Sequence, residues 1–138
     1  MMMHVTLSKA GALSGMDYLI VAATRCWRRA RDSGMPVQQH LYAVLSGHGW
    51  GVLAPVFDGL LAICETALGR RLAIGDGSIC SRDELLLCDL LDAARPGRST
   101  CGDSQPFGPV MDGAIRSARI MIGLVIEGQS ARFRANDP

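Results

Sequence analysis

Five stretches of this chain carry apolar residues at helical spacing, and glycine or proline interrupts the chain between them. Apolar side chains three or four residues apart lie on one face of an α-helix, whereas Gly and Pro mark helix ends. The chain has 138 residues, near the usual size of one domain. The sequence therefore predicts an all-α fold, a bundle of about five helices forming one domain over residues 1–138.

Local signals place the ends of several of these helices. Ser14 is a predicted N-cap, and Gly34 is followed two residues later by a proline, which indicates a left-handed stop. Pro55 suits the first turn of a helix because its missing N–H would be unpaired there. Ser81 with Glu84 three residues later forms a capping box, which predicts a helix starting directly after Ser81.

Other segments are less regular. Residues 70–75 could form one short extended segment closed by the glycine-containing turn that follows them. A competing interpretation makes 120–126 a strand as well, because this stretch is rich in apolar and β-branched residues. Residues 95–109 carry several prolines and glycines, which is typical of an irregular surface connection. The terminal segments 1–12 and 128–138 are expected to fray.

Charge and hydropathy exclude several classes of partner. Fourteen basic and thirteen acidic side chains give a net charge of +1, which argues against nucleic acid or an anionic membrane as the main partner. The apolar run at 120–126 is far shorter than the roughly 20 residues that span a bilayer. No basic and apolar leader opens the chain, and five cysteines is an odd count, so we expect a cytoplasmic protein with reduced thiols.

The cysteines give no sign of a metal or cofactor site. Zinc ligands commonly come in pairs about two to four residues apart, and no two of the five cysteines, Cys26, Cys64, Cys80, Cys88 and Cys101, have that spacing. Cys26 and Cys64 fall on or beside apolar helical faces, as small hydrophobic side chains do. Whether Cys80, Cys88 and Cys101 converge in space stays open.

Cys80 is the candidate reactive thiol. It precedes the capping box at Ser81, with Arg82 close by, and a helix N-terminus or a cation lowers the pKa of a nearby thiol. The alternative is an ordinary loop cysteine.

The Ser46–Gly51 loop is the most unusual local feature because it places His48 and Trp50 between glycines. Glycine allows close backbone approach, and a histidine beside a large flat ring can bind a small molecule. His40, at the margin of an apolar helical face, is a weaker ligand-binding candidate, and the alternative is a histidine satisfied at the edge of the core. The alternative is a tight turn in which Trp50 covers the core.

Apolar surface exceeds what a five-helix bundle of this size needs inside. The last helix is apolar around most of its circumference, and Leu85 with Cys88 lies opposite a filled leucine face. The candidate interface residues are therefore Leu85, Cys88, Ile120 and Leu124, and the expected partner is a second copy in a homodimer.

These features favour a non-enzymatic helical protein that acts through self-association or a protein partner. The alternative is a small-molecule sensor or minor enzyme with its pocket near the Ser46–Gly51 loop. No G-x-S-x-G, H-E-x-x-H or Walker motif is present, so no catalytic residue is expected.

Overall fold

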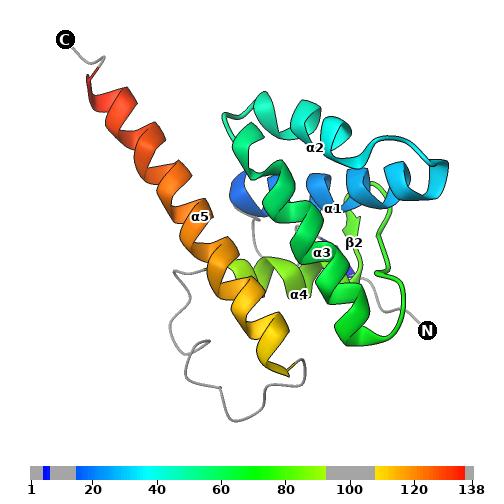
Figure 1. Ribbon diagram of the computed structural model, residues 1–138. Helices are drawn as coiled ribbons and strands as arrows, with labels where there is room; N and C mark the ends of the chain where they lie inside the picture. The colour runs from blue at the N-terminus through cyan, green and yellow to red at the C-terminus, as the bar shows by residue number, and fades with distance from the viewer. Residues whose placement is uncertain (1–4, 7–14, 93–107, 136–138) are drawn as a thin grey trace.

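The computed structural model describes residues 5–6, 15–92 and 108–135, and within these ranges the protein is all-α, as predicted (Figure 1). Helices account for most of the described chain, and two short strands form a single antiparallel pair. The elements in chain order are β1 (Val5–Thr6), α1 (Gly15–Ser33), α2 (Val37–Ser46), the 3-10 helix η1 (Gly51–Leu53), α3 (Ala54–Leu68), β2 (Ile79–Cys80), α4 (Arg82–Leu91) and α5 (Gly108–Ala135).

All five α-helices contribute to one hydrophobic core. Helix α3 packs against α1, α2 and α5, while α4 joins α1 to α5, and α5 runs along one side of the molecule (Figure 1). Each helix buries at least one large side chain almost completely, as Trp27, Leu41, Phe57, Leu87 and Met111 show. Burying such a side chain contributes about 1.5–3 kcal/mol, so this shared core is the main source of stability.

The helix end predicted at Gly34 and the helix start predicted after Ser81 are present, and Pro55 lies in the first turn of α3. The N-cap predicted at Ser14 lies outside the described residues. Gly34 and Gly69 adopt φ angles of 68° and 70° after α1 and α3, a left-handed conformation that glycine reaches without strain. The Ser81 hydroxyl accepts a hydrogen bond from the Glu84 N–H, and the Glu84 carboxylate accepts one from the Ser81 N–H, which completes the capping box.

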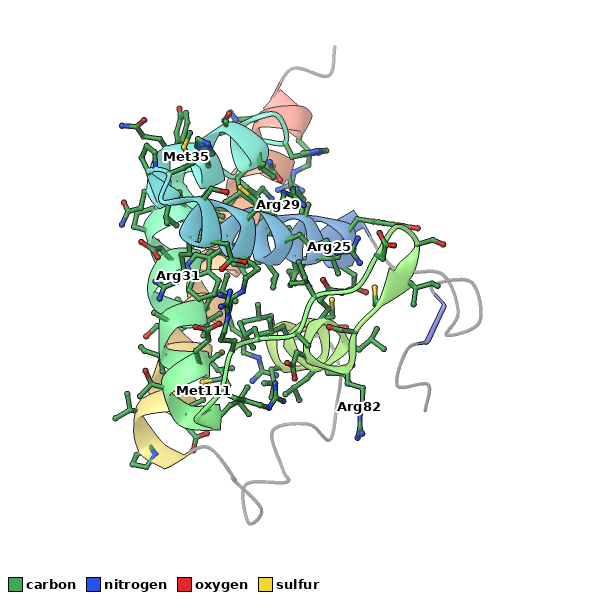
Figure 2. The ribbon with its side chains drawn as sticks, turned by 90° about the vertical axis from the view of Figure 1, so that its right-hand side faces the viewer. Arg25, Arg29, Arg31, Met35, Arg82 and Met111 are labelled. Atoms are coloured by element: carbon green, nitrogen blue, oxygen red, sulfur yellow. The ribbon has the colours of Figure 1, made fainter. Side chains whose placement is uncertain are left out.

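A two-pronged ion pair joins α1 to the start of α4. Arg25 donates from Nε and Nη2 to the two carboxylate oxygens of Glu84, at 2.8 and 3.1 Å, and the Glu84 side chain is fully buried. The same guanidinium donates to the carbonyls of Gly77 and Ile79. The hydrogen bond to Glu84 raises the pKa of Arg25. Figure 2 shows Arg25 facing the segment that carries β2, while Arg82 points away from the molecule. One side chain therefore fixes both α4 and the turn before it.

A second pair fixes the chain between α3 and β2. Arg70 donates two hydrogen bonds to Asp83, at 2.7 and 2.9 Å, and the Ala73 N–H donates to the same carboxylate. The Ser81 hydroxyl in turn donates to the Ala73 carbonyl. Arg70 holds the pKa of Asp83 below its usual range, and the Ala73 hydrogen bond acts in the same direction.

The short extended segment lies later in the chain than 70–75. Residues 71–75 form no strand, because side chains of the α4 N-terminus bind both backbone groups of Ala73. The regular pairing instead joins Val5–Thr6 to Ile79–Cys80. The prediction of fraying over 1–12 is therefore wrong for Val5–Thr6, and the rest of that segment lies outside the described residues.

The last helix is longer than predicted. It continues to Ala135, so the expectation of a frayed 128–138 segment is wrong as far as Ala135, and the strand alternative for 120–126 is also wrong. Ile122 is buried, and Val125 is half-buried against the same core, which extends the packed face of the helix. Of the predicted 95–109 connection, residues 95–107 lie outside the described residues and residues 108–109 belong to α5.

Replacing Glu84 with alanine is expected to lower the free energy of unfolding by about 3 kcal/mol, because Arg25 then keeps a largely buried charge without its partner. Chemical denaturation measures the change. The exposed Arg132, changed to alanine, is the control and should shift stability by less than about 0.5 kcal/mol. A similar loss in both variants would contradict this role for the ion pair.

Asp83 should make the free energy of unfolding depend on pH in the acid range. Its pKa is lower in the folded state, so its contribution is fully present above the ordinary aspartate pKa of about 4 and is lost as the pH falls through the folded value. Denaturant titrations of the wild type and of Asp83→Asn across the acid range measure this. The variant should lose less stability between neutral and acid pH than the wild type, and equal slopes would contradict the assignment.

Candidate functional site

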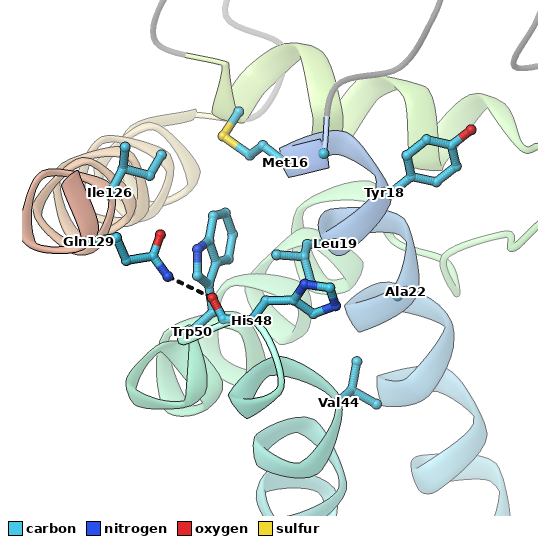
Figure 3. Close-up of a pocket in the computed structure, with 10 residues that line it drawn as sticks. Met16, Tyr18, Leu19, Ala22, Val44, His48, Trp50, Ile126 and Gln129 are labelled. Carbon is cyan, nitrogen blue, oxygen red and sulfur yellow. Dashed lines mark hydrogen bonds between the residues drawn. The ribbon is translucent and has the colours of Figure 1, made fainter. Parts of the chain in front are cut away.

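A pocket of about 650 Å³ opens where α1, the end of α2 and the C-terminal half of α5 meet (Figure 3). Its volume falls within the range of about 300–1,000 Å³ found for small-molecule sites. We call it the Trp50 pocket. It is lined by Gly15, Met16, Tyr18, Leu19, Ala22, Val44, His48, Trp50, Ile126 and Gln129.

The Ser46–Gly51 loop places its two candidate side chains in this pocket. The N–H groups of His48 and Trp50 both donate to the Leu45 carbonyl, which folds the loop tightly onto the end of α2. Gly49 has a φ of 80°, a conformation that suits glycine. Trp50 is 3% exposed and forms a wall continuous with the core, whereas His48 is exposed at the rim. The structural and the binding interpretations of Trp50 are thus compatible.

A side chain from α5 fastens the loop. The Gln129 carboxamide donates from Nε2 to the His48 carbonyl at 2.6 Å (Figure 3). A Cβ at Gly49 would collide with that carboxamide, so the absence of a side chain there makes room for the contact. No sequence pattern indicates a role for Gln129, because it lies beyond the predicted end of the last helix.

His40 does not join His48 and Trp50. It lines a separate hollow of about 480 Å³ between α1 and α2, with Cys26, Arg29 and Met35 among its neighbours. The structure therefore does not bring His40 together with His48 and Trp50.

The surroundings of Cys80 differ from those expected of a reactive thiol. Its side chain is completely buried, and burial raises the pKa of the thiol, with Glu84 acting in the same direction more strongly than Arg25 opposes it. The helix N-terminus that was expected to lower this pKa is occupied by the carboxylate of its own capping box. Cys26 and Cys64 are buried as predicted, and burial raises the pKa of Cys64 to about 12.

Of Cys80, Cys88 and Cys101, whose convergence the sequence leaves open, Cys80 and Cys88 lie in the same region of the core. Cys88 contacts the Asp17 carbonyl with its sulfur, and the carboxyl of Asp17 raises the pKa of both Cys80 and Cys88, after burial as the main cause for each. Cys101 lies outside the described residues. Within the described ranges, no group of three or more histidine, cysteine, aspartate or glutamate side chains could hold a metal ion.

The predicted interface residues separate into two groups. Ile120 and Leu124 are 57% and 58% exposed on the outer face of α5. Cys88 is 4% exposed and Leu85 is half-buried against the core, so the prediction of an outward-facing pair on α4 is wrong. The rotation of α4 about its axis explains this, because the buried ion pair with Arg25 turns Glu84 inward. Cys88 lies one turn later on the same side of the helix.

Two charged residues flank Ile120 and Leu124, and the sequence analysis missed them. Arg116 lies one turn before Ile120 and Glu127 about one turn after Leu124, and both are exposed. At 100° per residue these four side chains fall within about 80° of the helix circumference. They define what we call the outer α5 face, and the signal that could have found them is their spacing of four, four and three residues.

One described segment, Gly51–Leu68, is long and apolar enough to cross a membrane by length and composition alone. It comprises η1 and α3, whose Phe57, Leu60 and Leu61 are buried against neighbouring helices. Its apolar character is therefore used in the core, as is usual for a central helix.

Comparisons with known proteins return no relative. No protein-family model, no curated protein and no solved structure matches this chain.

The four described cysteines should resist alkylation in the folded protein, because the thiolate is the reacting form and all four thiols are buried. Iodoacetamide labelling followed by peptide mapping measures each site separately. Labelling of Cys80 should be slowed at least about tenfold relative to the denatured protein, because local opening must precede reaction. Fast labelling of Cys80 in the native protein would restore the reactive-thiol hypothesis.

Proposed function

We propose that this protein is non-enzymatic and acts by associating with a second copy of itself through the outer α5 face. The observation that carries the proposal is the exposure of Ile120 and Leu124, two large apolar side chains one turn apart. Contiguous exposed apolar patches commonly mark interaction sites. A single self-complementary patch is what a two-fold dimer requires.

The order of charges supports a second copy in the antiparallel direction. A two-fold axis near residue 122 would place Ile120 opposite Leu124 of the second copy, and Arg116 beside Glu127 of the second copy. A parallel pair in register would instead place like charges opposite each other, which is unfavourable. The face is therefore complementary to itself in one orientation.

Open space beside the apolar pair supports a close approach. Gly113 and Gly123 lie on the outer α5 face, and a Cβ added at either would meet no atom within 4 Å. Small residues at a helix contact let the axes approach to the short end of the usual 8–10 Å separation. The large side chains of one copy can then fill the space over the glycines of the other.

A cytoplasmic location is part of the proposal. Cys26, Cys64, Cys80 and Cys88 are free and buried. Free thiols suit a reducing compartment.

A second candidate function is the binding of a small molecule in the Trp50 pocket. It is favoured by the placement of His48 and Trp50 on the same cavity, against two different helices. This function does not depend on dimer formation, because Ile120 and Leu124 do not line that pocket.

Replacing Leu124 with arginine is expected to give a monomer at micromolar concentrations at which the wild type sediments as a dimer. A charged side chain at the centre of the contact would be buried without a partner. Val52→Arg is the matched control, since Val52 is 62% exposed on η1 and is not part of the outer α5 face. A monomeric wild type would overturn the proposal, and so would dissociation of the control variant.

Charge exchange tests the antiparallel arrangement. Arg116→Glu and Glu127→Arg should each weaken the dimer, and the double variant should recover most of the lost affinity, because the pair then has opposite charges again. Close charged pairs at interfaces couple by about 1.5 kcal/mol or more. Additive losses in the double variant would contradict this arrangement.

A further inference from the structure

We infer that the Trp50 pocket binds an uncharged small molecule with a flat apolar body and a hydrogen-bond donor at one end, a phenol or a similar hydroxylated aromatic. The inference rests on the second candidate function and names its ligand class. It is independent of the proposed dimer.

The lining of the pocket disfavours a formally charged ligand. None of its ten lining residues is Asp, Glu, Lys or Arg. Its walls come instead from Met16 and Leu19 on α1, Val44 on α2 and Ile126 on α5. An ionised group moved from water into such surroundings loses its hydration without gaining a counter-charge. The ligand body is therefore apolar and uncharged.

The pocket offers an aromatic wall at its inner side. The Trp50 indole is almost completely buried, and it lies between α5 and α1 in Figure 3. Aromatic rings can meet edge-to-face, so the small part of Trp50 that stays exposed can contact the ring of a flat ligand. The second tryptophan, Trp27, is elsewhere, with its Nε1 donating to Asp58 at 2.9 Å.

The polar groups of the pocket favour a ligand that donates a hydrogen bond. Gln129 uses its Nε2 on the His48 carbonyl, and among the described residues its Oε1 accepts no hydrogen bond. The carboxamide is fixed by that contact and faces the pocket beside Trp50 (Figure 3). A hydroxyl on the ligand can donate to this oxygen or to a ring nitrogen of His48 at the rim.

The two tryptophans give the experiment its internal reference. The probes are 2-naphthol and 2-naphthoate, which share a ring system and differ in charge at neutral pH. In ¹⁵N–¹H spectra of the full chain, 2-naphthol should shift the indole N–H signal of Trp50 and the carboxamide signals of Gln129, while the Trp27 signal stays in place. The anionic probe should bind at least about tenfold more weakly, because its charge is not compensated.

Variants separate this pocket from other binding. Ala22→Phe fills the pocket and should abolish the Trp50 shift, whereas Ala67→Phe, at an exposed position of α3, should not. Gln129→Leu removes the acceptor and should weaken 2-naphthol binding about tenfold. A folded Ala22→Phe protein that still shows the shift would overturn the site.

The remaining outcomes show whether only the proposed ligand class fails or whether small-molecule binding in this pocket fails as well. Equal or tighter binding of 2-naphthoate would overturn the uncharged class and leave small-molecule binding in place. No shift with either probe, together with an unchanged melting temperature across a broad metabolite set, would overturn both.

Discussion

The architecture depends on the need to cover apolar helix surface within one small core. Helix α3 meets this need by packing against α1, α2 and α5, so its wide apolar arc is largely covered. Helix α5 lies at the side of the molecule and packs mainly against α3, with fewer contacts to α4. Its inner residues, such as Met111 and Ile122, complete the core, while Ile120 and Leu124 face outward. Helix α5 therefore carries four of the nine large apolar side chains that are exposed in the described residues.

Local sequence signals predict the helix boundaries. The side of each helix that faces the core depends on long-range contacts, which local signals do not show. Ser81, Gly34 and Gly69 act on their immediate neighbours, so their roles follow from the sequence. The rotation of α4 depends on Arg25, nearly sixty residues earlier in the chain, through its pair with Glu84. A helical wheel gives the angles between side chains but not which side meets the core, so the sequence pattern alone cannot show that Cys88 faces inward.

The candidate pocket was predictable only in part. The glycines on either side of His48 and Trp50 predict the loop as a candidate site, because a tight turn rarely needs a large ring between glycines. Its third wall is formed by Ile126 and Gln129, and Gln129 reaches the loop only because α5 continues past its predicted end. The polar tail suggested fraying, whereas the contact between Gln129 and the His48 carbonyl is tertiary and leaves no local pattern.

Helix α5 serves the two proposed sites with different residues. Ile126 and Gln129 line the Trp50 pocket, and Arg116, Ile120, Leu124 and Glu127 form the outer α5 face. The two sets share no member, so one site can be changed while the other is kept. This separation lets dimer formation and ligand binding be assigned independently.

The most direct measurement is an isotope-filtered NOE experiment on a sample that mixes two differently methyl-labelled copies of the chain. Filtering removes contacts within one helix, where Ile120 and Leu124 are already neighbours. The account predicts cross-peaks from the Ile120 methyl groups of one copy to the Leu124 methyl groups of the other. Cross-peaks between copies that involve other surfaces, or none at all at concentrations where the wild type sediments as a dimer, would contradict it.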